Sequence, residues 1–399
     1  MNSEKPAVLI IVENLPVPID RRVWQEARAL RDAGYDVSVI SPKGGQFTAG
    51  HERIEGIEVW RHSLPEASRP LAYLLEYGWA LAAEFALALR IYARKRFRIL
   101  HAANPPDTIF LIALFFRLFG VRFVFDHHDL NPELFEAKFG KKSGFLYRLV
   151  CLAERLSYRT AAVSIATNES YREVAIKRGG MNPERVFLVR STPDLARMKP
   201  VAPQPGVRRG RRYLVAYLGV MGPQEGVPLL LEAAREIVLQ RGPETVHFVL
   251  IGSGTEAARL RSLAGELGLN SVVEFTGRIP DDELAAYLST ADVCVAPDPK
   301  NPMNDKSTMN KILEYMAFGR PTVLFDLAEG RRSAGGSALY AQPNDAADLA
   351  RQIMTLLDSE PLRKKLGGEG LSRIAGPLNW ELQKEALLAA YEMALAKRG

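Results

Sequence analysis

The sequence predicts an α/β protein with two doubly wound parallel sheets, one in each half of the chain. Short runs of β-branched residues alternate with helical stretches throughout residues 1–200, and the same alternation restarts after residue 212. The chain has 399 residues and 47% hydrophobic content, which exceeds one ordinary core and suffices for two domains. We therefore expect two domains that face each other across a cleft.

The first half supplies the elements of the first sheet. The expected strands are 7–13, 35–41, 57–63, 98–103, 122–128, 161–168 and 185–192, with helices at 22–33, 71–95 and up to residue 119. The segment 199–212 is rich in proline and arginine and has no periodicity, which indicates an interdomain linker. The first domain is therefore expected to span residues 1–200.

The second half repeats the pattern. The expected strands are 213–219, 245–252, 271–277, 291–297, 321–326 and 337–342, with helices at 227–241, up to 267, from 281 and at about 308–318. We assign residues 201–376 to a second Rossmann-like domain. Residues 377–399 are expected to form a C-terminal helix that packs back on the first domain. Such sheets bind ligands at the carboxyl ends of their strands, hence in the expected cleft.

Composition narrows the class of protein. Cys151 and Cys294 lie far apart in apolar runs, so we expect neither a disulfide framework, nor a zinc cluster, nor any other metal site. The N-terminus lacks the layout of a signal peptide, and no window is apolar for long enough to span a membrane. The net charge of +6 resides in the first half. We expect a cytoplasmic protein that does not bind nucleic acid.

The turn at 252–257 imitates a dinucleotide-binding fingerprint. Its sequence, GSGTEA, follows an expected strand, opens a helix, and precedes Glu274 by about 20 residues. Glycines at this position allow an anionic group to approach the first N–H groups of the helix. NAD(P) binding, a plain strand-to-helix turn, and a different nucleotide contact all remain open.

The segment 302–321, PMNDKSTMNKILEYMAFGRP, is more informative. Its polar residues crowd a helix start, where unpaired N–H groups and the helix dipole favour a phosphate. Lys311 and Glu314 are three residues apart and share a helix face, so that one can contact a diphosphate and the other ribose hydroxyls. Alternatively, Ser307 or Thr308 is a simple N-cap and Lys311 and Glu314 form a solvated pair.

These segments together resemble glycosyltransferase family 4, a group of retaining enzymes with the glycosyltransferase-B fold. The resemblance implies an acceptor-binding first domain and a donor-binding second domain, with a nucleoside-diphosphate sugar as donor. The matching stretches cover nearly the whole chain and are residues 21–44, 227–237, 248–260, 273–297 and 314–323.

The resemblance also implies the donor site. Glu314 corresponds to the second glutamate of the family's Glu-x7-Glu motif and is expected to hold the ribose, while Arg278 and Ile279 meet the nucleobase. The remaining expected donor-binding residues are Gly219, Arg190, Gly252, Asp305, Lys306, Ser307, Thr308, Met309, Asn310 and Lys311.

Two departures from the family pattern affect the charges of this site. The first glutamate of the motif falls on Lys306, with Asp305 one residue away. The loop 217–226 has Val220, Met221 and Glu225 where the family has an arginine and a lysine. We therefore expect Lys311 and Arg190 to neutralise the diphosphate, without a metal or other cofactor.

The strand that ends near residue 128 is expected to contribute to the acceptor side. Alternation along a strand places Asp126 and His128 on one face and His127 with Asp129 on the other, which is unfavourable for chelation of one ion by both histidines. The resemblance implies that His128 lies near the transferred sugar, although it could merely bond a loop. Arg21 and Arg22 are expected on the acceptor side with Asp126 and Asp129, or else form a solvated helix start.

Two segments combine long apolar faces, aromatic residues and arginines. Residues 71–98 and 108–120 have the composition of interfacial helices, and Arg94, Lys95, Arg96 and Arg98 form a cationic cluster suited to anionic lipid. Alternatively, these helices simply cover the sheet. The first reading predicts peripheral attachment to the inner face of the plasma membrane.

The combined prediction is a retaining glycosyltransferase of the hexosyltransferase type. It would move a sugar from a UDP-type donor to a glycan or lipid-linked acceptor in surface polysaccharide or glycoconjugate synthesis, with His128, Lys311 and Glu314 as catalytic residues. One alternative is a sugar-nucleotide-binding protein without transfer activity. Another is an NAD(P)-dependent oxidoreductase, which would leave residues 305–321 unexplained.

Overall fold

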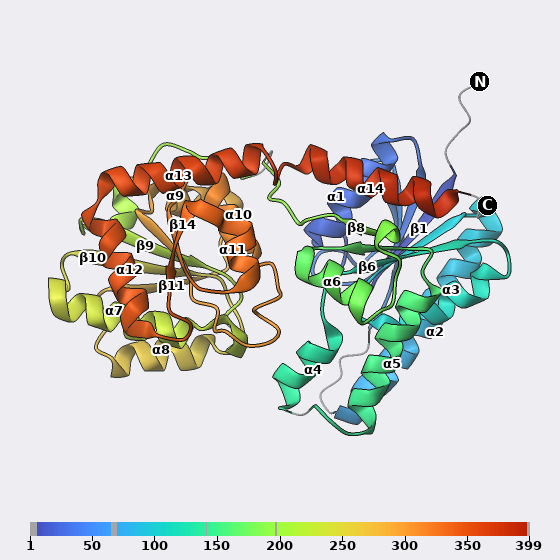
Figure 1. Cartoon of the computed structure of the whole chain (residues 1–399), viewed down its shortest axis with the longest axis horizontal. Coiled ribbons are helices and arrows are strands. Elements are labelled where there is room, and N and C mark those ends of the chain that lie inside the picture. Colours follow the sequence, from blue (N-terminus) through green and yellow to red (C-terminus); the bar gives the residue numbers. More distant parts are fainter. Residues whose placement is uncertain (1–5, 65–69, 141, 196–197, 397–399) are drawn as a thin grey trace. The chain divides into compact units, whose positions relative to one another are not determined.

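The computed structural model describes residues 6–64, 70–140, 142–195 and 198–396 (Figure 1). The chain divides into two compact units, each considered by itself below. The first consists of Met1–Arg190 together with Trp380–Gly399, and the second of Ser191–Asn379. Each unit is built on a largely parallel sheet flanked by helices, as the alternating pattern predicts.

The first unit contains, within its described residues, a sheet of eight strands in the order β3-β4-β2-β1-β5-β6-β7-β8. All neighbours are parallel except β3 and β4, an antiparallel hairpin that the sequence pattern did not reveal. The strands are β1 (Ala7–Val12), β2 (Asp36–Pro42), β3 (His51–Ile54), β4 (Ile57–His62), β5 (Ile99–Ala103), β6 (Arg122–His127), β7 (Val163–Ala166) and β8 (Val186–Leu188).

Helices cover both faces of this sheet, because each face carries its own apolar cluster. The helices are α1 (Arg21–Asp32), α2 (Pro70–Lys95), α3 (Phe110–Arg117), α4 (Asn131–Phe139), α5 (Phe145–Thr160), α6 (Glu169–Lys177) and α14 (Trp380–Leu395). Helix α1 begins at Asp20, whose side chain accepts a hydrogen bond from the Val23 amide. Helices α4 and α5 were not predicted from the sequence.

The second unit contains a sheet of six parallel strands, counted over its described residues, in the order β11-β10-β9-β12-β13-β14. The strands are β9 (Tyr213–Leu218), β10 (Val246–Ile251), β11 (Val273–Gly277), β12 (Val293–Ala296), β13 (Thr322–Phe325) and β14 (Ala338–Ala341). The helices are α7 (Val227–Arg241), α8 (Ala257–Glu266), α9 (Asp281–Thr290), α10 (Asn310–Ala317), α11 (Ala328–Ala334), α12 (Ala346–Asp358) and α13 (Glu360–Ala375).

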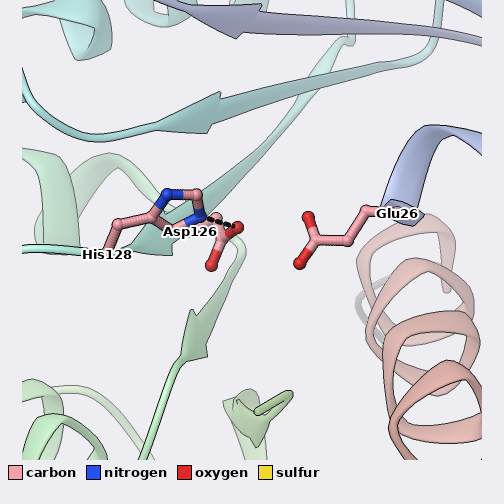
Figure 2. Close-up of side chains that lie close together, drawn as sticks. All are labelled: Glu26, Asp126 and His128. Atoms are coloured by element: carbon pink, nitrogen blue, oxygen red, sulfur yellow. Dashed lines mark hydrogen bonds and ion pairs between the residues drawn. The ribbon is translucent and has the colours of Figure 1, made fainter. Parts of the chain in front are cut away.

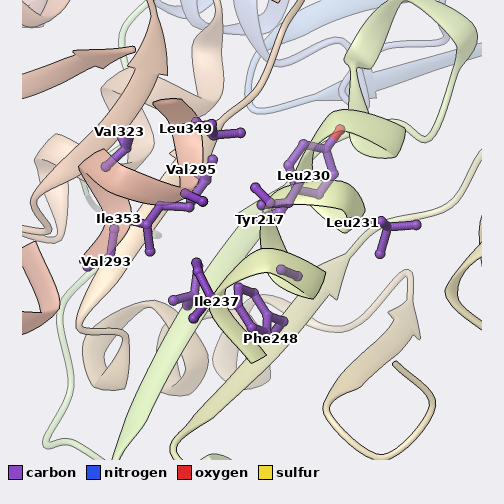
Figure 3. Packing of buried hydrophobic residues seen from close by; sticks show 14 of the residues in the cluster. Tyr217, Leu230, Leu231, Ile237, Phe248, Val293, Val295, Val323, Leu349 and Ile353 are labelled. Carbon is purple, nitrogen blue, oxygen red and sulfur yellow. The ribbon is translucent and has the colours of Figure 1, made fainter. Parts of the chain in front are cut away.

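Apolar side chains of α7 and α12 pack on one face of the second sheet (Figure 3). Leu230 of α7 and Leu349 of α12 are fully buried with Phe248 and Val295 of the strands. On the other face, α9, α10 and α13 bury two further apolar clusters. The sheet is therefore fixed from both sides, and its strand ends provide a rigid base for the loops that follow them.

The predicted linker and domain boundary are wrong. The contact division falls after Arg190, not after residue 200, and the segment predicted as a linker packs on the second unit. The Val201 amide donates to Ser289 Oγ at 2.9 Å, and Arg208 forms an ion pair with Asp292. Two arginines of the predicted linker, Arg208 and Arg209, therefore pair with carboxylates of the second unit.

Helix α14 completes the core of the first unit. It starts at Trp380, and its residues Leu387 and Tyr391 are fully buried in the apolar cluster shared with α1. The Tyr391 hydroxyl lies 2.8 Å from Nδ1 of His101 in β5. The last helix of the chain is therefore an integral part of the unit formed by the first half.

We expect Leu387→Ala to lower the free energy of unfolding of the first unit by about 2–5 kcal/mol, because it opens a cavity at a fully buried position. All four tryptophans of the sequence lie in this unit, so tryptophan fluorescence during urea unfolding follows it. Leu382→Ala on the same helix is the matched control, since Leu382 is 49% exposed. Equal stability of the two variants would contradict this role of α14.

Candidate functional site

The loops at the carboxyl ends of β9, β10 and β12 pack closely in the second unit. At Gly252 (φ +131°), an added Cβ would lie 1.9 Å from the Gly219 carbonyl oxygen. At Gly226 (φ +66°), it would lie 1.9 Å from the Pro297 carbonyl oxygen. Both positions need glycine because one backbone touches another there. The structure therefore brings Gly219 and Gly252, both predicted donor-site residues, into direct contact.

The turn at 252–257, which imitates a dinucleotide-binding fingerprint, packs against the loop after β9. A Cβ on Gly254 would lie 2.4 Å from the Met221 carbonyl oxygen. The same carbonyl accepts a hydrogen bond from the Glu256 amide at the start of α8, and the Met221 amide donates to the Ser253 carbonyl. These glycines therefore accommodate the loop after β9. The geometry does not support their use for the pyrophosphate of a dinucleotide.

Lys311 of α10 lies in a buried ion cluster. Its Nζ is 2.7 Å from Asp298 Oδ1 and 2.6 Å from Glu225 Oε2, and it lies over the ring of Tyr217. Burial acts to lower the pKa of Lys311, but the two carboxylates outweigh it and raise that pKa. Burial also raises the pKa of Asp298. The lysine is thus fully charged, buried, and committed to two partners.

This cluster corrects the predicted role of Lys311. We expected an accessible cation for the diphosphate, or a solvated pair with Glu314. Instead Lys311 is only 8% exposed, whereas Glu314 is half-buried. Spacing along a helix places residues on a face, but it does not show how deeply that face is buried.

Helix α10 begins at Asn310, two residues later than predicted. Its N-cap is Met309, which makes no side-chain capping hydrogen bond, so Ser307 and Thr308 are not the N-cap. The Ser307 hydroxyl donates to the Met303 carbonyl at 2.9 Å instead. The helix is fixed deeper in the unit by the Tyr315 hydroxyl, which accepts from the Leu218 amide and donates to the Val295 carbonyl.

The remaining predicted donor residues lie in different parts of the two units. Asp305 accepts a hydrogen bond from the Ala328 amide at the start of α11, and Lys306 precedes α10 by four residues. Arg278 is exposed after β11, and Ile279 packs beside an apolar cluster. Arg190 belongs to the first unit, where its backbone N–H donates to Gln383. Within the second unit, the structure therefore groups Gly219, Gly252 and the start of α10.

A second polar cluster lies at the end of β6 in the first unit (Figure 2). Asp126 is fully buried and bonds both Arg22 and His128. Arg22 also contacts Glu26 at 2.9 Å, and its Nε donates to His128 Nε2 at 2.9 Å. His101 Nε2 lies 3.4 Å from Asp126. Arg22 is therefore not solvated: it is enclosed by the residues it was expected to accompany.

The charges of this cluster are set by burial and by Arg22. Burial acts to raise the pKa of Asp126, but Arg22 and His128 outweigh it and hold that pKa well below its usual value. Burial raises the pKa of Glu26 well above its usual value and lowers the pKa of His101. We infer a charged Arg22–Asp126 pair, beside which burial shifts Glu26 towards its neutral form.

Glu26, Asp126 and His128 each offer a ligand atom within 4.8 Å of the others, which is a geometry that could hold a metal ion. However, the Arg22 guanidinium contacts all three residues. A positive charge thus already stands among these ligand atoms. A divalent ion would have to displace it, so the donor set does not fit a metal.

Asn104 shapes the loop that carries His128. Its Oδ1 accepts from the amides of His128 and Asp129, and its Nδ2 donates to Asp107 and to the Asp129 carbonyl. As alternation predicts, His127 points away from His128, with its Nδ1 2.7 Å from the Tyr158 hydroxyl. Arg21 is exposed. Sequence reasoning missed Glu26, His101 and Asn104.

Two family models match the chain. "Glycosyl transferase 4-like domain" matches residues 19–192, and "Glycosyl transferases group 1" matches residues 212–359. The chain belongs to this glycosyltransferase family. The match assigns each family domain to one of the two units and confirms the resemblance inferred from the motifs.

Curated relatives of this family include a D-inositol 3-phosphate glycosyltransferase of Geodermatophilus obscurus, which is 30% identical over 62% of this chain and 54% of the relative. A mannosylfructose-phosphate synthase of Agrobacterium fabrum is 25% identical over 66% of this chain and 58% of the relative. The matched region thus spans little more than half the length of these relatives.

Solved structures of low sequence identity show the same fold. A sucrose-phosphate synthase of Thermosynechococcus elongatus has a TM-score of 0.79 at 20% identity, with 97% of this chain and 98% of that chain covered. The Anabaena protein HepE, solved in complex with UDP and glucose, has a TM-score of 0.74 at 17% identity, with 97% and 99% covered. The fold is therefore the glycosyltransferase-B fold of the family.

We expect Lys311→Met to destabilise the second unit by about 3–5 kcal/mol, because Asp298 and Glu225 lose the cation between them. Calorimetry should show an earlier melting transition, while tryptophan fluorescence of the first unit stays unchanged. Lys364→Met is the control, since that lysine is exposed on α13. If Lys311→Met instead left stability intact and removed only nucleotide binding, the predicted diphosphate role would be restored.

The electrostatics near β6 predict a pH-dependent effect at His127. Burial lowers its pKa from 6.5 to about 3, so the stability associated with the neutral ring is present above pH 6.5 and is lost as the pH falls towards 3. His127→Asn removes this loss. The stability cost of His127→Asn, followed by tryptophan fluorescence, should therefore shrink by about 2 kcal/mol from about pH 7 to about pH 5. An equal cost at both pH values would refute the buried neutral histidine.

Proposed function

We propose that this protein transfers a sugar from a nucleoside-diphosphate donor, with UDP as the carrier, to a hydroxyl of a glycan or lipid-linked acceptor. The observation that carries the proposal is the start of α10. Lys311 in its first turn ties it to Glu225 in the loop after β9 and to Asp298 after β12, and its N-cap residue makes no side-chain capping hydrogen bond. Such a helix start favours a phosphate group, and Glu314 follows one turn later.

The relatives support the choice of donor. HepE, which has the same fold, is solved in complex with UDP and glucose. The curated relatives carry names of sugar-transfer enzymes that act on inositol phosphate or synthesise mannosylfructose phosphate. The family and the start of α10 together support a nucleoside-diphosphate donor. The family alone supports the acceptor class.

In the proposed reaction, the bond between the anomeric carbon and the donor diphosphate breaks as the acceptor oxygen attacks that carbon on the same face. Negative charge develops on the leaving diphosphate, and backbone N–H groups at the start of α10 stabilise it. The acceptor proton passes to the departing phosphate. The anomeric configuration is retained, and no metal takes part.

His128 positions the transferred sugar in this scheme. Nε2 of its ring lies within hydrogen-bond distance of both Arg22 Nε and Asp126 Oδ2, and these two neighbours determine the orientation of the imidazole. Asn104 fixes the backbone of the same residue. Glu314 binds the ribose hydroxyls of the donor. Lys311 acts indirectly, by holding the loop after β9 against α10.

A non-catalytic sugar-nucleotide-binding protein is the second candidate. The observation that favours it is the replacement of charged family positions by Glu225 and Lys306. The two candidates differ in turnover: a transferase releases UDP from a UDP-sugar in the presence of acceptor, whereas a binding protein holds the donor unchanged. The test therefore combines donor binding with release of UDP in a membrane-lipid extract.

We expect Glu314→Ala to weaken UDP binding by about 1–3 kcal/mol, because the ribose hydroxyls lose their acceptor. Isothermal titration of the full chain measures this effect. Glu283→Ala is the control, since Glu283 is exposed on α9. Unchanged affinity of the Glu314 variant would remove the assigned role of this residue.

A further inference from the structure

Helix α5 is amphipathic, but it turns polar side chains towards the interior and apolar side chains towards solvent. The side chains that it buries in the first unit are Glu154, Ser157 and Tyr158, whereas much of its exposed surface is apolar. Phe145 is 79% exposed, and Leu146, Leu149 and Leu152 are between 44% and 49% exposed. A helix that only covered a sheet would turn its leucines inward. This orientation therefore requires an explanation.

Polar contacts fix α5 in this orientation. Glu154 accepts a hydrogen bond from Arg178 at 2.6 Å, and the Ser157 hydroxyl donates to the Asp107 carbonyl at 2.7 Å. The Tyr158 hydroxyl lies 2.7 Å from His127 Nδ1. Rotation of the helix to bury its leucines would break all three contacts. The apolar stripe is thus held outward by the interior of the unit.

The exposed residues of α5 form an apolar stripe with a row of arginines beside it. Phe145, Leu149 and Leu152 follow each other at helical intervals and form one stripe. Arg148, Arg155 and Arg159 are also exposed and border this stripe on one side. A helix with an apolar stripe beside a row of cations suits the boundary between lipid headgroups and acyl chains.

Helix α3, which packs on α5, extends the same surface. Leu111, Leu114 and Leu118 are exposed at helical spacing, with Leu118 81% exposed. Figure 1 shows α3 and α5 in the same part of the first unit. Exposed apolar side chains therefore occur on two helices that pack together. Exposed apolar patches mark interaction sites in soluble proteins.

A small hollow between these helices is lined by three arginines. Arg117 of α3, Arg122 at the start of β6 and Arg159 of α5 contribute to its wall. Among the residues that the structure describes, none of these guanidinium groups has a carboxylate partner or a side-chain hydrogen bond. Three such cations beside an apolar surface are electrostatically complementary to anionic phosphate headgroups.

We propose that the α3–α5 face docks the protein on an anionic phospholipid bilayer, with a lipid phosphate in the hollow formed by Arg117, Arg122 and Arg159. Phe145, Leu149 and Leu118 enter the acyl boundary. None of the helices in the described part of the chain is long and apolar enough to cross a bilayer. This proposal goes beyond the transfer reaction, since docking is measurable whether or not a donor is consumed.

The docking surface differs from the one predicted at residues 94–98. Lys95 of that cluster pairs with Asp36 and Glu58, Arg94 lies over the ring of Trp60, and Arg96 lies over the ring of Tyr92. These side chains are engaged within the unit. The proposed docking face therefore keeps the predicted interfacial segment 108–120, which contains α3, and uses α5 in place of the cationic cluster at 94–98.

Co-sedimentation of the full chain with vesicles tests the proposal. Vesicles of phosphatidylcholine and phosphatidylglycerol in equal parts should bind the protein, and vesicles of phosphatidylcholine alone should bind it much more weakly.

Arg117→Gln with Arg159→Gln should weaken binding roughly fivefold for each arginine, and added salt should have a similar effect. Phe145→Ser with Leu149→Ser should weaken binding at every salt concentration. All four positions are exposed, so the folded state persists, and tryptophan fluorescence verifies this.

Arg94→Gln with Arg96→Gln is the matched control and should bind like the parent protein. The proposal is overturned if the parent protein does not prefer the anionic vesicles, or if the control variant loses binding while the α3–α5 variants retain it. Self-association through this face, detected as a concentration-dependent dimer that the serine variants abolish without any vesicle binding, would also overturn it. These outcomes are independent of UDP binding, which tests the proposed function separately.

Discussion

An ammonium group enclosed between two carboxylates holds the loops of the second unit in place. Lys311 links α10 to the end of β12 through Asp298, and to the loop after β9 through Glu225. Removing the cation would leave Asp298 buried with an uncompensated charge, which is costly in a low-dielectric interior. The start of α10 therefore depends on this cluster for its position. A phosphate that binds there meets a site already formed.

The first unit uses the same physical device, a cation enclosed by carboxylates. Here a guanidinium, Arg22, is enclosed by Asp126, Glu26 and His128. Figure 2 shows these three surrounding side chains. In each unit a cation at the end of a central strand is neutralised internally. In the proposed mechanism, this makes the backbone dipoles at the start of α10 the principal stabilisers of the diphosphate. The cluster also fixes the orientation of the His128 ring.

The alternating pattern predicted both sheets because strands that are buried on both faces form unmistakable apolar runs. The same reasoning missed α4 and α5. In α5 the apolar residues face solvent and Glu154 faces the interior, so its pattern does not indicate which side is buried. The alternative that Lys311 and Glu314 form a solvated pair was wrong for a related reason: spacing gives the face of a helix, and only tertiary packing gives depth. Glu26 was missed because it is one of several charged residues of α1, and His101 because its partners Asp126 and Tyr391 are distant in sequence. The fold class, the family and the importance of residues 302–321 came from the sequence, whereas the pairing of charges required the structure.

Hydrogen–deuterium exchange of the full chain with and without UDP, GDP or ADP tests the central claim most directly, because it locates a bound nucleotide without assuming an acceptor. The account predicts that UDP slows exchange in the loop 219–226 and in the first turn of α10, and that GDP and ADP have smaller effects. Protection confined to the turn at 252–257 with NAD(P), or the absence of protection in the second unit with every nucleoside diphosphate, would contradict the account.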